Sequence, residues 1–94
     1  MTKSTKSVLV LSRRDHQEAM RVAAGLTIFG HDVRLVFMGE PLTEADATGE
    51  QAELMELADI EPETTIVELA DDLNCLDAAA LGAAIQSCDL VVNI

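Results

Sequence analysis

Hydrophobic and polar positions divide this chain into two kinds of segment. Four short runs rich in Val, Leu and Ile are continuous rather than alternating, which is typical of strands buried on both faces of a sheet. These runs span residues 6–11, 33–38, 64–69 and 89–94. Between them, apolar residues recur every three or four positions, as they do along one face of an α-helix. The pattern therefore predicts strands and helices in alternation.

Three helices are expected, over residues 15–29, 50–59 and 74–87. Each has a start signal in the sequence. Asp15 with Glu18, and Thr48 with Gln51, have the spacing of a capping box, and Asn74 is a good N-cap residue. Along the last helix the apolar positions form one stripe: Leu76, Ala80, Leu81, Ala84, Ile85 and Cys88.

The order of these elements predicts the fold class. Strands that alternate with helices form a mostly parallel sheet, because a parallel connection needs a crossover long enough to hold a helix. We expect an α/β fold, a three-layer sandwich with a mostly parallel sheet of about four strands. At 94 residues the chain forms a single small domain spanning residues 1–94.

Charge is distributed unevenly along the chain. All six basic residues lie in the first 34 positions, whereas residues 35–94 hold 14 of the 17 acids and no base, and the net charge is −11. Such a surface repels nucleic acid and anionic membranes, because phosphate binding needs clustered Lys and Arg. Two interpretations stay open: the acids favour solubility, as in salt-adapted proteins, or they form a face for a basic partner protein.

Cellular location is predicted from three features. The longest apolar run is shorter than the roughly 18 residues that a membrane span needs. Residues 1–7 lack the apolar segment of a secretory signal. Two cysteines are too few for a disulfide framework. A cytoplasmic protein that does not bind membranes is expected.

The loop after the first strand is the first candidate binding site. Ligands of parallel sheets bind beyond the carboxyl ends of the strands, where Ser12, Arg13, Arg14 and His16 follow one strand and Gly39 follows the next. Two guanidiniums beside the N-terminus of a helix could bind an anion, and a histidine there could act as a neutral base. The competing interpretations are a solvated turn and an ordinary exposed histidine.

Several other kinds of site receive no support. The sequence contains neither the Gly-rich dinucleotide fingerprint nor the P-loop. The acidic pair of a response-regulator receiver does not follow the first strand, and neither a Ser-His-Asp set nor a histidine metal cluster is evident. We therefore expect no cofactor and no metal ion.

Cys75 is the candidate nucleophile. On the expected last helix it falls in the first turn, opposite the apolar stripe, and should be exposed. A helix N-terminus favours the thiolate, whereas Asp71, Asp72 and Asp77 oppose it. The alternatives are a sulfur-accepting or redox thiol and an unremarkable small residue at a helix start. Cys88 lies within the apolar stripe and is expected in the core.

Residues 6–42, KSVLVLSRRDHQEAMRVAAGLTIFGHDVRLVFMGEPL, resemble the N-terminal half of the DsrE/DsrF-like family of small sulfur-relay proteins. The shared features are an apolar strand, a short polar loop, and an Ala-rich helix that closes with Leu26, Gly30, His31 and Val33. The stretch ELADDLN, residues 68–74, is similar to an acidic segment of the family. The resemblance covers about 40% of the chain well.

The resemblance implies a cytoplasmic oligomer, homomeric or heteromeric. Active members of this family carry a persulfide on a cysteine at the carboxyl end of a central strand. This chain has Glu68, Leu69 and Ala70 at those positions, and Cys75 follows about five residues later. The chain is also shorter than most members, with four expected strands where five are usual.

The leading hypothesis is therefore a DsrE-like sulfur-relay or sulfur-metabolism accessory protein, at most a sulfur carrier or sulfurtransferase. It would act through contacts within a homo-oligomer and with a sulfur-carrier protein partner. Cys75 would accept the sulfur, and Arg13 and Arg14 would steer an anionic donor. One alternative is a non-catalytic oligomeric interaction module with the same fold. Another is a small-anion or nucleotide binder at the Ser12–His16 loop.

Overall fold

The architecture is an α/β fold built on one parallel sheet. The computed structural model describes residues 6–43, 46, 49–69 and 73–94. In these residues five strands form a sheet of order β4-β3-β2-β1-β5, and every neighbouring pair is parallel. The predicted α/β class and parallel sheet are confirmed, with five strands in the sheet where about four were expected.

Three strands form the long part of the sheet. β1 (Ser7–Ser12) lies between β2 (Asp32–Phe37) and β5 (Leu90–Asn93), with Val10 aligned to Leu35 on one side and Val92 on the other. Residues 8–12 of β1 are all buried. The continuous apolar run follows from this central position, since side chains alternate between two covered faces.

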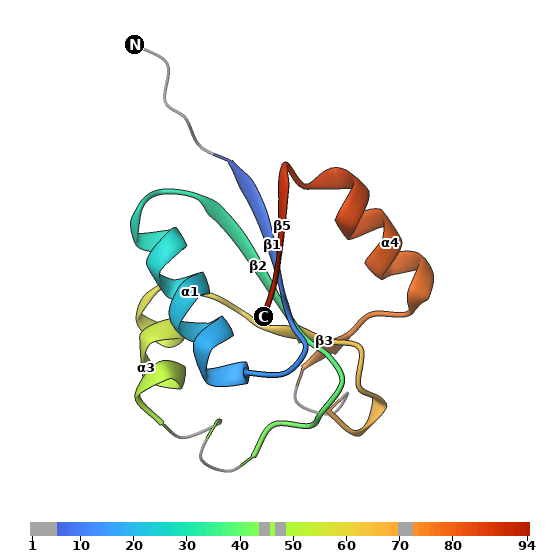
Figure 1. The fold of residues 1–94 in the computed structure, drawn as a ribbon, viewed down its shortest axis with the longest axis horizontal. Coiled ribbons are helices and arrows are strands. Elements are labelled where there is room, and N and C mark those ends of the chain that lie inside the picture. The colour runs from blue at the N-terminus through green and yellow to red at the C-terminus, as the bar shows by residue number, and fades with distance from the viewer. Residues whose placement is uncertain (1–5, 44–45, 47–48, 70–72) are drawn as a thin grey trace.

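Helices cover both faces of the sheet (Figure 1). On one face α1 (His16–Ile28) and α3 (Glu50–Leu57) pack on Val8, Val10, Leu35 and Phe37 through Ala19, Met20, Ala23 and Met55. On the other face α4 (Ala78–Ser87) packs on Leu9, Leu11 and Val36, mainly through Ala84 and the preceding Leu76. The two cores account for the apolar periodicity of the helices.

Two of the three helices begin where the sequence predicts, α1 after Asp15 and α3 at Glu50, whereas α4 begins later than expected. Asp15 caps α1, where its carboxylate accepts the Glu18 backbone N–H at 3.1 Å, as expected. Gly49 is the N-cap of α3; Thr48, the expected cap, lies outside the described residues. Asp77 caps α4, and its carboxylate accepts the Ala80 N–H at 2.8 Å.

The segment between α3 and α4 differs most from the expectation. The predicted strand over residues 64–69 is wrong: β3 is only Glu63–Thr64, and a 3-10 helix, η1, follows at Val67–Leu69. The Thr64 hydroxyl donates to the Phe37 carbonyl at 2.9 Å and accepts the Ile66 N–H at 3.0 Å, which turns the chain out of the sheet. The predicted helix start at Asn74 is also wrong, because Asn74–Cys75 form the edge strand β4.

In the described part of the chain, no helix combines the length and the apolar character needed to cross a bilayer.

Candidate functional site

A pocket of about 480 Å³ lies at the carboxyl edge of the sheet and contains the candidate nucleophile. It is formed where β2, β3 and β4 end and α4 begins. Its lining residues are Met38, Thr65, Val67, Cys75, Leu76, Asp77, Ala78 and Leu81. In a parallel sheet this edge is where ligands are expected.

Backbone hydrogen bonds fix the position of Cys75. β4 aligns Cys75 with Thr64 of β3, and the next N–H, that of Leu76, donates to the Thr64 carbonyl at 2.7 Å. The Phe37 carbonyl accepts the Thr65 N–H at 3.1 Å, which ties this edge to β2. The ends of three neighbouring strands therefore hold the cysteine in the pocket wall.

Cys75 is exposed and free, as expected, but it does not lie in the first turn of a helix. The helix begins three residues later, and the Asp77 carboxylate already accepts one of its first N–H groups. Asp71 and Asp72, the other carboxylates expected near the thiol, lie outside the described residues. The predicted position of Cys75 in the first turn of a helix is therefore wrong.

The chemistry available in the pocket is narrow. Among the lining side chains that the structure describes, Cys75 and Asp77 are the titratable ones; apart from Thr65, the others are apolar. A small group attached to the sulfur, such as one further sulfur atom, would meet mainly apolar side chains. Among the described residues, no group of three His, Cys, Asp or Glu side chains is placed to hold a metal ion.

Cys88 occupies a different environment. It is the C-cap of α4, partly buried in the core on that face of the sheet, and its thiol donates to the Ile85 carbonyl at 3.2 Å. Its packing agrees with the expected core role. The two cysteines therefore provide an internal comparison, one exposed in a pocket wall and one packed against the sheet.

His16 and Ser12 form a buried hydrogen-bonded pair. The His16 Nε2–H donates to the Glu40 carbonyl at 2.6 Å, and the Ser12 hydroxyl donates to Nδ1 at 2.5 Å. For the neutral imidazole this assignment follows because a carbonyl can only accept, so Nε2 carries the hydrogen and Nδ1 accepts. The imidazole also contacts Phe37 edge-on, with 5.1 Å between ring centroids. His16 is 5% exposed, so the interpretation as an ordinary exposed histidine is wrong.

The other residues of the first loop are arranged around this pair. Arg13 and Arg14 are exposed. Near the N-terminus of α1, the Ile94 carbonyl accepts the N–H groups of Arg14 and Asp15 at 3.3 and 3.5 Å. Gly39 has a φ of +80°, and a Cβ there would lie 2.8 Å from the Arg13 carbonyl oxygen. Gly39 thus lets the two loops approach closely.

The structure separates these two groups of predicted site residues. β2 and β3 lie between β1 and β4, and three strand spacings amount to roughly 14 Å. In the described part of the chain, the pocket wall at Cys75 includes none of Ser12, Arg13, Arg14, His16 and Gly39. The arginines therefore are not placed beside the thiol.

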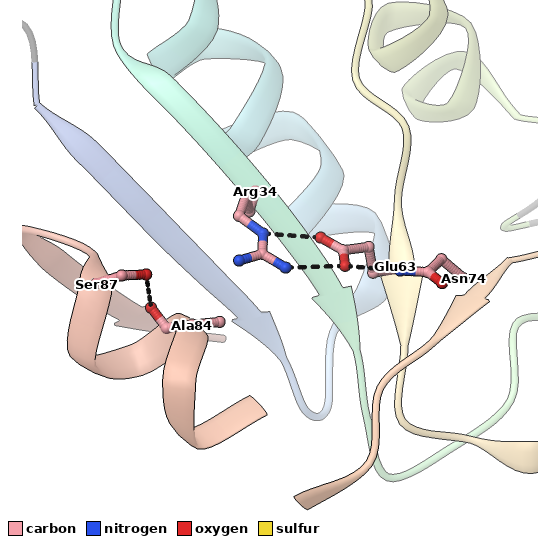
Figure 2. Close-up of polar contacts among 5 residues, drawn as sticks. All are labelled: Arg34, Glu63, Asn74, Ala84 and Ser87. Carbon is pink, nitrogen blue, oxygen red and sulfur yellow. Dashed lines mark hydrogen bonds and ion pairs between the residues drawn. The ribbon is translucent and has the colours of Figure 1, made fainter. Parts of the chain in front are cut away.

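A polar cluster across three strands was not predicted (Figure 2). Arg34 of β2 donates two hydrogen bonds to the Glu63 carboxylate of β3, both at 2.9 Å, and Asn74 of β4 donates one at 3.2 Å. The Arg34 guanidinium lowers the pKa of Glu63, and Glu63 raises the pKa of Arg34. The one hint in the sequence was a charged residue, Arg34, inside an apolar strand.

A second pocket, of about 520 Å³, lies on the face covered by α1 and α3, where Met20, Phe37 and Met55 form part of its wall. Asp46 is its notable polar residue. Partial burial would raise the pKa of Asp46, but hydrogen bonds, first those from Thr43 and then one from Gln17, together with the nearby His16, lower it. In return the Asp46 N–H donates to the Thr43 hydroxyl at 3.1 Å, the reciprocal pattern of a capping box. These bonds give Asp46 a structural role.

Comparison with known proteins finds no match: no family model, no curated protein and no solved structure matches this sequence or fold. The resemblance of residues 6–42 to the DsrE/DsrF-like proteins therefore stays a prediction.

Proposed function

We propose that this protein is a small DsrE-like sulfur-relay accessory of the cytoplasm that carries sulfur on Cys75. The observation that carries the proposal is an exposed, free thiol in a pocket at the carboxyl edge of a parallel sheet. The resemblance of the N-terminal half to this family supports the same chemistry. A sulfur-carrier protein would exchange sulfur with Cys75.

The proposed step is a sulfur exchange without net oxidation. The Cys75 thiolate attacks the outer sulfur of a donor persulfide, R–S–SH, and forms a new S–S bond. The S–S bond of the donor breaks, and its inner sulfur leaves as a thiolate that takes up a proton. Cys75 becomes a persulfide, and the donor becomes an ordinary thiol.

Intact-mass spectrometry tests this proposal. The wild type is incubated with glutathione persulfide, and Cys75→Ser and Cys88→Ser are treated in parallel. We expect one added sulfur atom in the wild type and in Cys88→Ser, and none in Cys75→Ser. Addition only after unfolding, or equal addition at both cysteines, would contradict a carrier role for Cys75.

A non-catalytic interaction module of the same fold is the second candidate. The observation in its favour is the exposure of two adjacent large apolar side chains at the end of α1, with Ile28 74% and Phe29 82% exposed. Exposed apolar side chains mark a protein interface where they form a contiguous patch. A protein that takes up no sulfur but self-associates or binds other proteins would favour this function.

Anion or nucleotide binding at the Ser12–His16 loop has weaker support. The Asp15 carboxylate and the Ile94 carbonyl already accept N–H groups at the start of α1, and His16 uses both ring nitrogens internally. An added anion would have to displace these groups.

A further inference from the structure

β5 is an edge strand with little protection against pairing. Within the described residues it pairs with β1 alone, and Leu90 at its start is 50% exposed. Soluble proteins usually protect such an edge with charges, a proline or a bulge, because its free N–H and C=O groups can pair with another strand. The sequence of β5, LVVN, contains neither a charged residue nor a proline.

The strand β5 and the preceding helix α4 contain no charged side chain, although the chain as a whole is acidic. Residues 78–88 and 90–94 contain no charged residue, whereas the whole chain carries −11. The acids that flank these segments each accept a backbone N–H, Asp77 that of Ala80 and Asp89 that of Ser7, both at 2.8 Å. Ile85 on α4 is 40% exposed, which adds to the apolar character of this region.

We infer that a second copy of this chain pairs along β5. The two β5 strands would run antiparallel about a two-fold axis and join the two sheets into one. A second copy fits because two molecules that each carry a net charge of −11 repel least along an edge whose strand has no charged side chain, and because a self-complementary edge satisfies two-fold symmetry. A basic partner would instead be drawn to the acidic surfaces.

The sheet register shows which side chains such pairing would bury. Leu90 and Val92 are aligned with Val8 and Val10, so their side chains lie on the face that α1 covers, and Val91 lies on the face of α4. Leu90 would gain cover from the partner, and Asn93, which is exposed, would lie at the new strand pair. This inference does not depend on sulfur transfer at Cys75.

Sedimentation equilibrium under reducing conditions tests the inference with the intact chain at several salt concentrations. We expect a monomer–dimer equilibrium that shifts toward dimer as salt increases, because salt screens the repulsion between the acidic copies. Leu90→Glu should weaken the dimer by about tenfold or more, since it removes apolar burial and adds a charge to both edges. Hydrogen exchange should show protected β5 amides in the wild type and faster exchange in this variant.

Two further variants keep the test decisive. Asn93→Asp adds one charge at the edge with almost no change in shape, and should weaken the dimer even if Leu90→Glu folds poorly. Leu57→Glu is the control for Leu90→Glu. It replaces a leucine on α3 that is more exposed than Leu90, and it should leave the dimer intact. A wild type that stays monomeric at all salt concentrations, or equal weakening by Leu57→Glu and Leu90→Glu, would overturn the inference.

Discussion

Gly39 is a residue whose conformation, rather than its chemistry, is required. Its φ of +80° disfavours any residue with a side chain, and a Cβ would lie 2.8 Å from the Arg13 carbonyl oxygen. Gly39→Ala should therefore destabilise the protein by about 1–3 kcal/mol. The free energy of unfolding in urea, measured for the variant and the wild type, checks this prediction.

Gly25 provides the matched control. It lies within α1, and a Cβ there would meet no atom within 4 Å. Gly25→Ala should stabilise the protein by about 0.5–1 kcal/mol, because alanine favours the helix. Equal effects of the two substitutions would mean that the Gly39 loop relaxes without cost.

Glu63 should make stability depend on pH. Its pKa is lowered from the ordinary value of 4.5, first by the hydrogen bonds from Arg34. The folded protein therefore holds this carboxylate ionised more strongly than the unfolded chain does. The resulting stability is fully present above the unfolded pKa and is lost as the pH falls through the folded pKa.

The measurement is the free energy of unfolding of the wild type and Glu63→Gln from pH 7 down to pH 3. At pH 7 we expect the variant to be less stable by roughly 1 kcal/mol, given that Arg34 is partly exposed and solvent screens the pair. The difference should shrink below about pH 4.5. Glu18→Gln, which removes the exposed ion pair with Arg21, is the control and should change stability little at any pH.

Residue identities could be predicted more readily than residue contacts. Cys75 stands out in the sequence as the candidate nucleophile, and the structure leaves it exposed. The sequence signal for the contact between Ser12 and His16 is their spacing across a strand-to-helix turn. This signal is weak, because the second partner of His16 is the backbone carbonyl of Glu40, and a backbone group leaves no mark in the sequence. The contact between Arg34 and Glu63 depends on strand order, which the sequence does not determine.

At the scale of elements, segments with a clear apolar pattern were predictable, including the four-residue strand β5, and the two-residue strands were not. β1, α1 and β2 lie within two residues of the expected bounds, because each has a clear apolar pattern and Asp15 marks the start of the helix. β3 and β4 have two residues each, too few to establish a period. Local hydrogen bonds, such as those of Thr64, decide where these strands end.

Because these short strands were not predicted, the environment expected for Cys75 was also wrong. Asn74 and Asp77 are both good N-cap residues, and the choice of Asn74 placed Cys75 in a helix. In the fold Asn74 donates to Glu63 from the edge strand, while Asp77 caps α4. The predicted helix start was three residues too early. For this reason the thiol was expected in a helical turn, whereas it lies at a strand end in a pocket wall.

For the whole molecule, the unbalanced charge should make stability depend on salt. Residues 35–94 contain 14 acids and no base, so many carboxylates repel one another in the compact state. Two like charges about 10 Å apart repel by about 0.4 kcal/mol in water, and 1 M salt shortens the screening length to about 3 Å.

We therefore expect the free energy of unfolding to rise by on the order of 1–2 kcal/mol between low salt and about 1 M NaCl, since several such pairs are screened. Thermal unfolding at pH 7 measures the effect. Because pairing along β5 would also respond to salt, the series is run with Leu90→Glu at low protein concentration. Stability that falls with salt would mean that attractive pairs such as Arg34–Glu63 outweigh the repulsion, and that the acids are well spaced in the folded protein.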